Sequence, residues 1–260
     1  MRVWAVANQK GGVGKTTTAI TLGGLLAEKG QRVLLLDLDP HGSMTSYFGY
    51  DPDTLQTSSF DLFSDQAISA QGVTRLLLDT SCEGLSLLPS SMALATVERK
   101  AAVEGMGLKV SQALAQIWDD FDYVLIDSPP VLGALMINAL AASERLLIPV
   151  QTEFLALKGL ERMIRTIAMV TRSLKKQLNY MIVPTLFDRR TQASVGALRE
   201  LRNTYPGTIW ASMIPVDTRF RDASREGKPV SQYQPNCRGA GAYRSLLKQL
   251  LLQQEQRRQA

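Results

Sequence analysis

The stretch QKGGVGKTT at residues 9–17 decides the fold. It follows a short apolar run and precedes a helical pattern. Glycines let the backbone turn so that successive N–H groups point inward at a chain of phosphates, and the helix N-terminus adds a partial positive charge. In such a loop Lys15 reaches the β and γ phosphates and the hydroxyl of Thr16 ligates Mg²⁺. The sequence therefore predicts a phosphate-binding loop (P-loop) between a strand and a helix.

Short apolar runs alternate with longer helical patterns along the rest of the chain, which is typical of repeated βαβ units. Several runs are apolar almost throughout, as in strands that are covered on both faces. We therefore expect an α/β fold, with a mostly parallel, doubly wound sheet and helices on both faces. The expected strands are residues 2–7, 32–36, 85–88, 123–126, 145–150, 180–184 and 208–214, and the expected helices are residues 16–29, 108–118, 134–142, 157–173, 192–204 and 241–254.

Two smaller features refine this outline. Gly30 follows Lys29 at the end of the first helical pattern, which predicts a left-handed helix cap. Residues 50–80 are rich in Asp, Ser, Thr and Gln, so we expect a surface excursion that contains a short helix.

Composition bounds the class of protein. The chain has 260 residues, of which 45% are hydrophobic and 20% charged, so it is able to bury a sizeable core. No composition shift marks a linker, and we expect a single domain over residues 1–260. No apolar run reaches the length of a secretory signal or a membrane span. We therefore expect a cytoplasmic protein without membrane insertion.

The net charge of +5 hides an asymmetry between the two halves of the chain. Residues 1–150 hold 10 Lys and Arg against 16 Asp and Glu, a balance of −6, and residues 151–260 hold 19 against 8, a balance of +11. A basic half of this kind either attracts a polyanion through counterion release or is simply a solvated surface. Composition leaves both readings open.

Cysteine and histidine usage excludes several classes of site. Cys82 and Cys237 are few and far apart in sequence, which fits a reducing compartment and offers no disulfide framework. His41 is the only histidine, so a zinc site or a Ser-His-Asp triad has almost no residues to be built from.

The loop departs from the strict P-loop pattern, and this departure carries a resemblance. Gln9 occupies the first glycine position, and a second lysine, Lys10, opens the loop. This arrangement resembles the deviant Walker A class of P-loop NTPases (SIMIBI type), the ParA/MinD family of ATPases. The resemblance implies that Lys10 crosses a dimer interface to contact the nucleotide of the other subunit, so that ATP binding and homodimer formation are coupled. A solvated loop lysine is the alternative.

The resemblance extends to two further segments, and with residues 8–17 they make the nucleotide site: residues 37–42 and 127–130. The sequence DLDPHG at residues 37–42 is similar to the switch I segment of the family, which implies that Asp39 orients the attacking water and that Asp37 lies near the metal. The family usually has Gln where His41 stands, so no role is assigned to His41. The sequence DSPP at residues 127–130 looks like the Walker B and switch II motif. A carboxylate at the end of a buried strand is well placed to hold a Mg²⁺-bound water, so Asp127 is the second expected metal contact through water.

Later segments resemble those that flank the base of the nucleotide, and from them we select Pro215 and Asp217. The resemblance as a whole implies ATP and Mg²⁺ as cofactors, slow hydrolysis of ATP and stimulation by a partner protein. The expected catalytic residues are Lys10, Lys15 and Asp39; the nucleotide-binding residues are Lys10, Gly11, Gly12, Val13, Gly14, Lys15, Thr16, Thr17, Pro215 and Asp217; and the metal contacts are Thr16, Asp37 and Asp127.

Three rival readings fit less well. Iron proteins of the same loop class carry a cysteine shortly after the Walker B strand, and residues 128–133 contain none. Tyrosine autokinases carry a tyrosine-rich tail, but residues 253–259 read QQEQRRQ. A membrane-binding C-terminal helix needs an apolar stripe opposite basic residues. The leucines at 246, 247, 250 and 251 form such a stripe, but they lie where the last helix of the family packs onto the sheet, so core packing is the favoured reading.

Two functions remain, both built on an ATP-gated dimer. One is a chromosome or plasmid partition ATPase whose dimer binds nucleoid DNA nonspecifically through arginines of the basic half: Arg189, Arg190, Arg219, Arg221, Arg225 and Arg238. The other is a cargo positioner that resembles the ParC-type proteins, which place chemotaxis arrays at cell poles with the help of a polar landmark protein. Residues 1–8 and 39–49 look most like the cargo-positioning members, and we favour that reading.

Overall fold

A seven-stranded sheet forms the centre of the computed structural model, which describes residues 1–63, 69–104 and 108–259. The strand order is β3-β4-β2-β5-β1-β6-β7, and all neighbours pair in parallel except β3 and β4. The strands are β1 (Arg2–Val6), β2 (Val33–Asp37), β3 (Leu78–Asp79), β4 (Leu85–Leu88), β5 (Tyr123–Asp127), β6 (Arg145–Gln151) and β7 (Asn179–Thr185). The predicted α/β fold with a mostly parallel sheet is confirmed.

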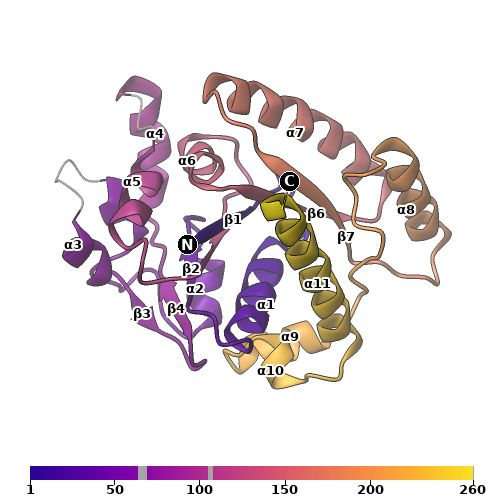
Figure 1. Cartoon of the computed structure of the whole chain (residues 1–260), viewed down its shortest axis with the longest axis horizontal. Coiled ribbons are helices and arrows are strands. Elements are labelled where there is room, and N and C mark those ends of the chain that lie inside the picture. The colour runs from indigo at the N-terminus through magenta and orange to yellow at the C-terminus, as the bar shows by residue number, and fades with distance from the viewer. Residues whose placement is uncertain (64–68, 105–107, 260) are drawn as a thin grey trace.

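Helices cover both faces of this sheet (Figure 1). The longer helices are α1 (Lys15–Ala27), α4 (Leu94–Glu104), α5 (Lys109–Gln116), α6 (Ala134–Ala142), α7 (Phe154–Ser173), α8 (Gln192–Thr204) and α11 (Arg238–Gln259). Short helices are α2 (Ser43–Tyr47), η1 (Ser59–Phe63), α3 (Ala70–Thr74), α9 (Arg219–Arg225) and α10 (Val230–Tyr233). One hydrophobic cluster joins α1 and α11 to one face of the sheet. A second cluster joins the helices α4, α5, α6, α7 and α8 to the opposite face.

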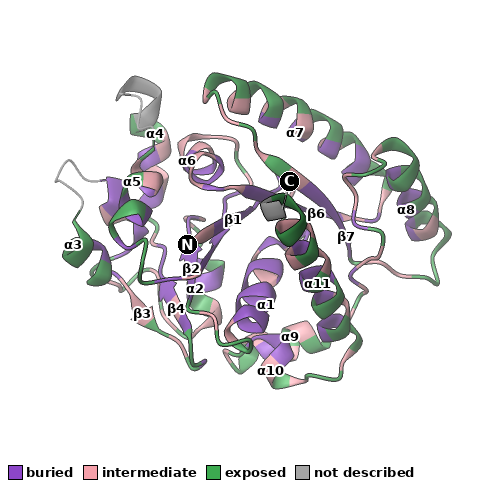
Figure 2. Ribbon diagram, viewed as in Figure 1, coloured by how far each residue is buried: buried purple, intermediate pink, exposed green. Residues whose placement is uncertain are grey.

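Alternation along the strands feeds both clusters. In β1, Val3 and Ala5 contribute to one cluster, whereas Trp4 and Val6 contribute to the other, as the two-residue period of a strand requires. Every residue of β2 and β5 is buried (Figure 2). These apolar strands end in Asp37 and Asp127, so the sheet brings two acidic side chains to its carboxyl edge.

One predicted strand is wrong. Residues 208–214 form no strand. Ile209 makes one isolated bridge to Ile182 of β7, and a second isolated bridge, between Phe187 and Pro215, lies just beyond both segments. The Ile182 N–H donates to the carbonyl of Thr208, whereas Pro184, two residues later, has no N–H to continue the ladder. The pairing therefore stops after one bridge and resumes at Ile214, whose N–H donates to the Pro184 carbonyl.

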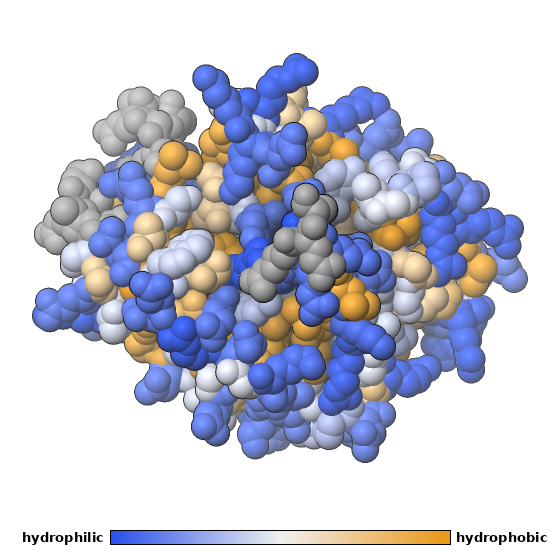
Figure 3. Space-filling view, viewed as in Figure 1, coloured by the Kyte–Doolittle hydropathy of each residue, from blue (hydrophilic) through white to orange (hydrophobic). Residues whose placement is uncertain are grey.

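Most other elements lie within a few residues of their predicted bounds, and Gly30 has the predicted left-handed conformation, with a φ of 76°. The excursion of residues 50–80 holds η1, α3 and β3, and its residues 64–68 lie outside the described part. Helices α2, α4, α9 and α10 were not predicted. Within the described ranges no helix has both the length and the apolar character of a membrane span. On the face in Figure 3, hydrophilic side chains surround smaller hydrophobic patches.

Candidate functional site

The loop between β1 and α1 has the open backbone that a phosphate chain requires. Gly12 and Gly14 have φ values of 72° and 92°, a left-handed conformation that favours glycine. In the described structure, no heavy atom beyond the chain neighbours lies within 4 Å of the place where a Cβ would stand at Gly11, Gly12 or Gly14. The loop is therefore an unobstructed cradle at the N-terminus of a 13-residue helix. Lys15 is only 7% exposed, and its Nζ lies 3.5 Å from the carbonyl oxygen of Lys10, so its ammonium group stays next to this cradle.

Two predicted metal contacts meet at the base of the loop. The hydroxyl of Thr16 donates to Oδ2 of Asp127 at 2.5 Å, and Oδ1 of Asp127 is buried and has no hydrogen-bond partner among the described residues. Burial raises the pKa of Asp127, and the negative charge of Asp37 raises it further. A buried carboxylate oxygen without a partner is costly unless a ligand or an ion satisfies it. A hydroxyl beside this oxygen, under an open phosphate cradle, fits a Mg²⁺ ion that is held mainly through water and phosphate oxygens.

Asp37 is satisfied by its own chain. Its Oδ2 accepts hydrogen bonds from the N–H and the hydroxyl of Thr45, at 2.9 and 2.8 Å, and its Oδ1 accepts from the N–H of Asp39 at 3.1 Å. Burial raises the pKa of Asp37, and the hydrogen bonds from Thr45 oppose this shift. Because both oxygens accept hydrogen bonds from residues 39 and 45, Asp37 holds the segment that carries Asp39.

Asp39 lies at the edge of the site with its side chain 13% exposed. Its Oδ1 accepts from the backbone N–H of His41 at 3.1 Å and lies 2.8 Å from the ring Nδ1 of the same residue. The hydroxyl of Ser90 donates to the Asp39 carbonyl at 2.5 Å. The other carboxylate oxygen of Asp39, Oδ2, takes part in none of these contacts, so the side chain keeps an acceptor that is able to orient a water.

Lys10 is held within its own chain. Its Nζ donates to Oε1 of Gln151 at 3.1 Å and forms an ion pair with Glu153, which precedes α7. The side chain of Lys10 is nevertheless 40% exposed. Two exposed apolar residues, Phe154 and Leu155, follow Glu153 directly. The structure therefore places Lys10 at the surface beside the loop, where a contact with a second chain requires exchange of its present partners.

A pocket of about 430 Å³ continues from the loop to the predicted base-binding segment. Its lining includes Gly12, Thr17, Leu186, Pro215 and Asp217. The Asp217 carboxylate accepts from the backbone N–H groups of Arg219 and Gly239, at 3.1 and 2.9 Å, so it shapes this wall of the pocket. Leu186 in this lining has a φ of 51°, a left-handed conformation that is uncommon for a residue with a side chain. A larger cavity of about 620 Å³ between α1 and α11 contains no phosphate cradle.

Comparisons with known proteins agree with this geometry. Residues 1–180 match the AAA domain family AAA_31. The chain is 36% identical over 251 residues to the sporulation initiation inhibitor protein Soj of Bacillus subtilis. This match covers 96% of this chain and 98% of Soj. It is also 36% identical over 261 residues to the chromosome partitioning protein ParA of Caulobacter vibrioides. That match covers 99% of this chain and 96% of ParA. The chain belongs to the ParA/MinD family of P-loop ATPases.

A solved structure shares the fold and carries a bound nucleotide. Cobyrinic acid a,c-diamide synthase from Mycobacterium smegmatis, with a bound ATP analogue and magnesium, is 37% identical and superposes with a TM-score of 0.82, covering 96% of this chain and 94% of that one. The nucleotide and metal contacts of the individual residues in this chain stay predictions.

Several residues that hold this ParA/MinD-type site were not predicted. Thr45 and Ser90 fix the two aspartates of residues 37–42, and Gln151 with Glu153 binds Lys10. These partners lie between 8 and 143 positions away in sequence. No local pattern marks them, because side chains of this kind occur on any solvated surface.

Proposed function

We propose that this protein is a Mg²⁺-dependent ATPase in which ATP binding gates formation of a homodimer and hydrolysis ends it, and that the dimer acts in the partition of DNA. The observation that carries the proposal is the meeting of Thr16 and Asp127 under an open glycine cradle, with one buried carboxylate oxygen left without a partner. ATP with Mg²⁺ is the ligand that supplies both the phosphates for the cradle and a cation for that oxygen.

The roles of the residues follow from their positions. Lys15 and the backbone N–H groups of the cradle stabilise negative charge on the phosphates, and Asp39 orients a water for in-line attack on the γ phosphate. The cation bound beside Thr16 supplies charge neutralisation to the phosphates. Lys10 supplies a further positive charge from the partner subunit after it leaves Glu153. Hydrolysis removes the γ phosphate that the two subunits share, so the dimer contacts are lost.

The partition role is supported by the named relatives and by the distribution of charge. Soj and ParA are a sporulation inhibitor and a chromosome partitioning protein by name. All six arginines named above are exposed, and Arg189, Arg190 and Arg238 line a cavity of about 520 Å³. Exposed arginines attract DNA phosphates without regard to sequence. We propose that the protein acts on the nucleoid and that a partner protein stimulates a low intrinsic rate of hydrolysis.

A second candidate is positioning of chemotaxis arrays through a polar landmark protein, which we favoured from sequence. It is supported by the likeness of residues 1–8 and 39–49 to cargo-positioning members. The named relatives support partition instead, so partition is now our first proposal and cargo positioning at a cell pole our second.

The experiment that tests the ATPase switch is multi-angle light scattering with Mg²⁺ and either ATP or ADP. We expect dimers with ATP and monomers with ADP, and monomers under both conditions for Lys15→Ala. Lys29→Ala, at an exposed position just after the end of α1, is the matched control and should behave as the wild type. A wild-type chain that remains monomeric with ATP would contradict the proposal. ATP-dependent retention on duplex DNA that weakens steeply with salt separates partition from cargo positioning.

A further inference from the structure

Helix α6 begins without a capping side chain of its own. Its N-cap is Gly133, which has no side chain to accept a hydrogen bond from the first turn. Glu98, from α4, supplies the acceptors instead: the N–H of Ala134 donates to Oε2 at 2.8 Å, and the N–H of Leu135 donates to Oε1 at 3.1 Å. A carboxylate that bridges two N–H groups at a helix N-terminus is a charge-assisted contact and is stronger than a neutral cap.

Gly133 is matched to this contact. A Cβ at Gly133 would stand 1.8 Å from Oε2 of Glu98, well inside van der Waals contact. The backbone at Gly133 has φ −131° and ψ −160°, an extended conformation that any residue adopts. Space for the Glu98 carboxylate, and not backbone freedom, is therefore the reason for glycine at this position.

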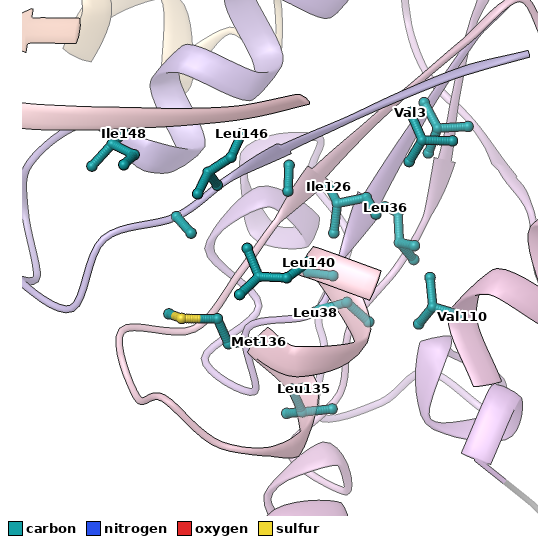
Figure 4. Close-up of a cluster of buried hydrophobic side chains, with 14 of the residues drawn as sticks. Val3, Leu36, Leu38, Val110, Ile126, Leu135, Met136, Leu140, Leu146 and Ile148 are labelled. Carbon is teal, nitrogen blue, oxygen red and sulfur yellow. The ribbon is translucent and has the colours of Figure 1, made fainter. Parts of the chain in front are cut away.

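The contact fixes one end of the loop that follows Asp127. At the other end, the hydroxyl of Ser128 donates to the carbonyl of Val6 at 3.0 Å. Helix α6 is itself seated on the sheet, because Leu135, Met136 and Leu140 pack with Ile126 and Leu146 in the same hydrophobic cluster (Figure 4). Residues 129–132 are thus held between two anchored ends.

Helix α4 also leads back to the segment that carries Asp39. Ser90, a few residues before α4, donates its hydroxyl to the Asp39 carbonyl and its N–H to the hydroxyl of Thr45. The connection from Ser90 through α4 to Glu98 therefore joins both acidic segments of the site. Within the described part of the chain, Glu98 makes no hydrogen bond or ion pair with the loop of residues 9–17.

We propose that Glu98 is a positioning residue, which sets the loop of residues 128–133 relative to the Asp39 segment through its contact with the start of α6. The proposal rests on the proposed ATPase function and adds a control point away from the nucleotide. The loop presents Val131, which is 62% exposed, to solvent at the face that carries Asp127. Loss of the Glu98 contact lets this loop shift, which lowers ATP-dependent dimer formation and turnover but leaves the cradle for the phosphates intact.

The test compares Glu98→Ala, Gly133→Ala and the double variant. Gly133→Ala expels the Glu98 carboxylate without backbone strain, so it reaches the same state by a different change. Gly159→Ala is the matched control, because no heavy atom lies within 4 Å of the added Cβ. We expect ADP affinity within about twofold of the wild type, and a loss of about tenfold in kcat and in dimer affinity, the size expected when a charge-assisted hydrogen bond is lost. The double variant should be no worse than either single variant.

Three results would overturn the proposal. The first is wild-type kcat and dimer affinity in both single variants. The second is an equal loss of ADP affinity, which indicates general damage to the fold, and the third is unchanged amide exchange at the start of α6. If Glu98→Ala does not fold, Glu98→Gln keeps the volume and one acceptor oxygen and should show a smaller loss of kcat. Amide hydrogen exchange of Ala134 and Leu135, measured without nucleotide, should be at least about tenfold faster in Glu98→Ala than in the wild type. Unchanged exchange refutes the contact, even where the wild type forms no ATP dimer and the proposed function fails.

Discussion

Asp37 and Asp127 are register partners at the carboxyl ends of the neighbouring strands β2 and β5. Both side chains are almost fully buried, so two carboxyl groups lie next to each other in a medium that disfavours their charge. Burial raises the pKa of each, and the charge of Asp37 raises that of Asp127 further. The chain therefore carries a buried acidic pair that is costly when ionised, at the place where the proposed function requires a cation.

A pH dependence of metal-free stability follows from this pair. A carboxyl whose pKa is raised in the folded state contributes stability that is fully present below its unfolded value, near pH 4, and is lost as the pH rises through the raised value. Without nucleotide and Mg²⁺, we expect the midpoint of thermal unfolding to fall by about 3 °C or more from pH 5 to pH 8. Asp127→Asn should reduce this fall. Calorimetry over this range is the measurement.

The control for this prediction is Asp53→Asn, at an exposed position, which should keep the wild-type dependence. In the wild type at pH 8, addition of ATP with Mg²⁺ should raise the midpoint of unfolding back to its pH 5 value, because a ligand that binds only the folded state stabilises it by mass action. An Asp127→Asn protein with the same pH dependence as the wild type would show that the pair is not the source.

Lys10→Ala should separate nucleotide binding from dimer formation. The phosphate cradle and Lys15 are unchanged in this variant, so ATP affinity should stay within about threefold of the wild type, whereas the charge that reaches the partner is lost. We expect no ATP-dependent dimer by light scattering. Lys248→Ala, exposed on α11, is the matched control. Normal dimers in Lys10→Ala would show that Lys10 acts only as a solvated lysine beside Glu153.

Asp39→Ala should trap the dimer that Lys10→Ala prevents. Removal of the carboxylate that orients water slows hydrolysis by about 100-fold or more but leaves the groups that bind phosphate in place. We expect dimers that persist with ATP, measured by light scattering over hours, and little release of phosphate. Asp53→Ala should turn over ATP as the wild type does. Release of phosphate at the wild-type rate from Asp39→Ala would assign the water-positioning role to another group.

The sequence predicted the local parts of the site and missed the long-range ones. The loop around Gly12 and the strand that ends in Asp127 could be recognised because each is a contiguous pattern with a physical reason. The partner of Lys10 could not, since Glu153 lies 143 positions away and only the fold brings it close. The same limit explains residues 208–214, an apolar run that reads as a strand but whose ladder fails at Pro184, on the neighbouring strand.

Arg189→Ala and Arg238→Ala test whether the basic half binds DNA. Both arginines are exposed and line the same cavity, and Arg189 forms no ion pair with any described residue, so its charge is available to a phosphate. Each phosphate contact that is lost lowers the slope of log K against log salt by about one unit, without regard to DNA sequence. We expect weaker ATP-dependent binding for each variant and a reduced salt slope, while the ATP-dependent dimer forms as in the wild type. Arg75→Ala, exposed in the acidic half, is the matched control. An unchanged salt slope in both variants would remove this cavity from the DNA surface and would leave cargo positioning as the better account of the dimer.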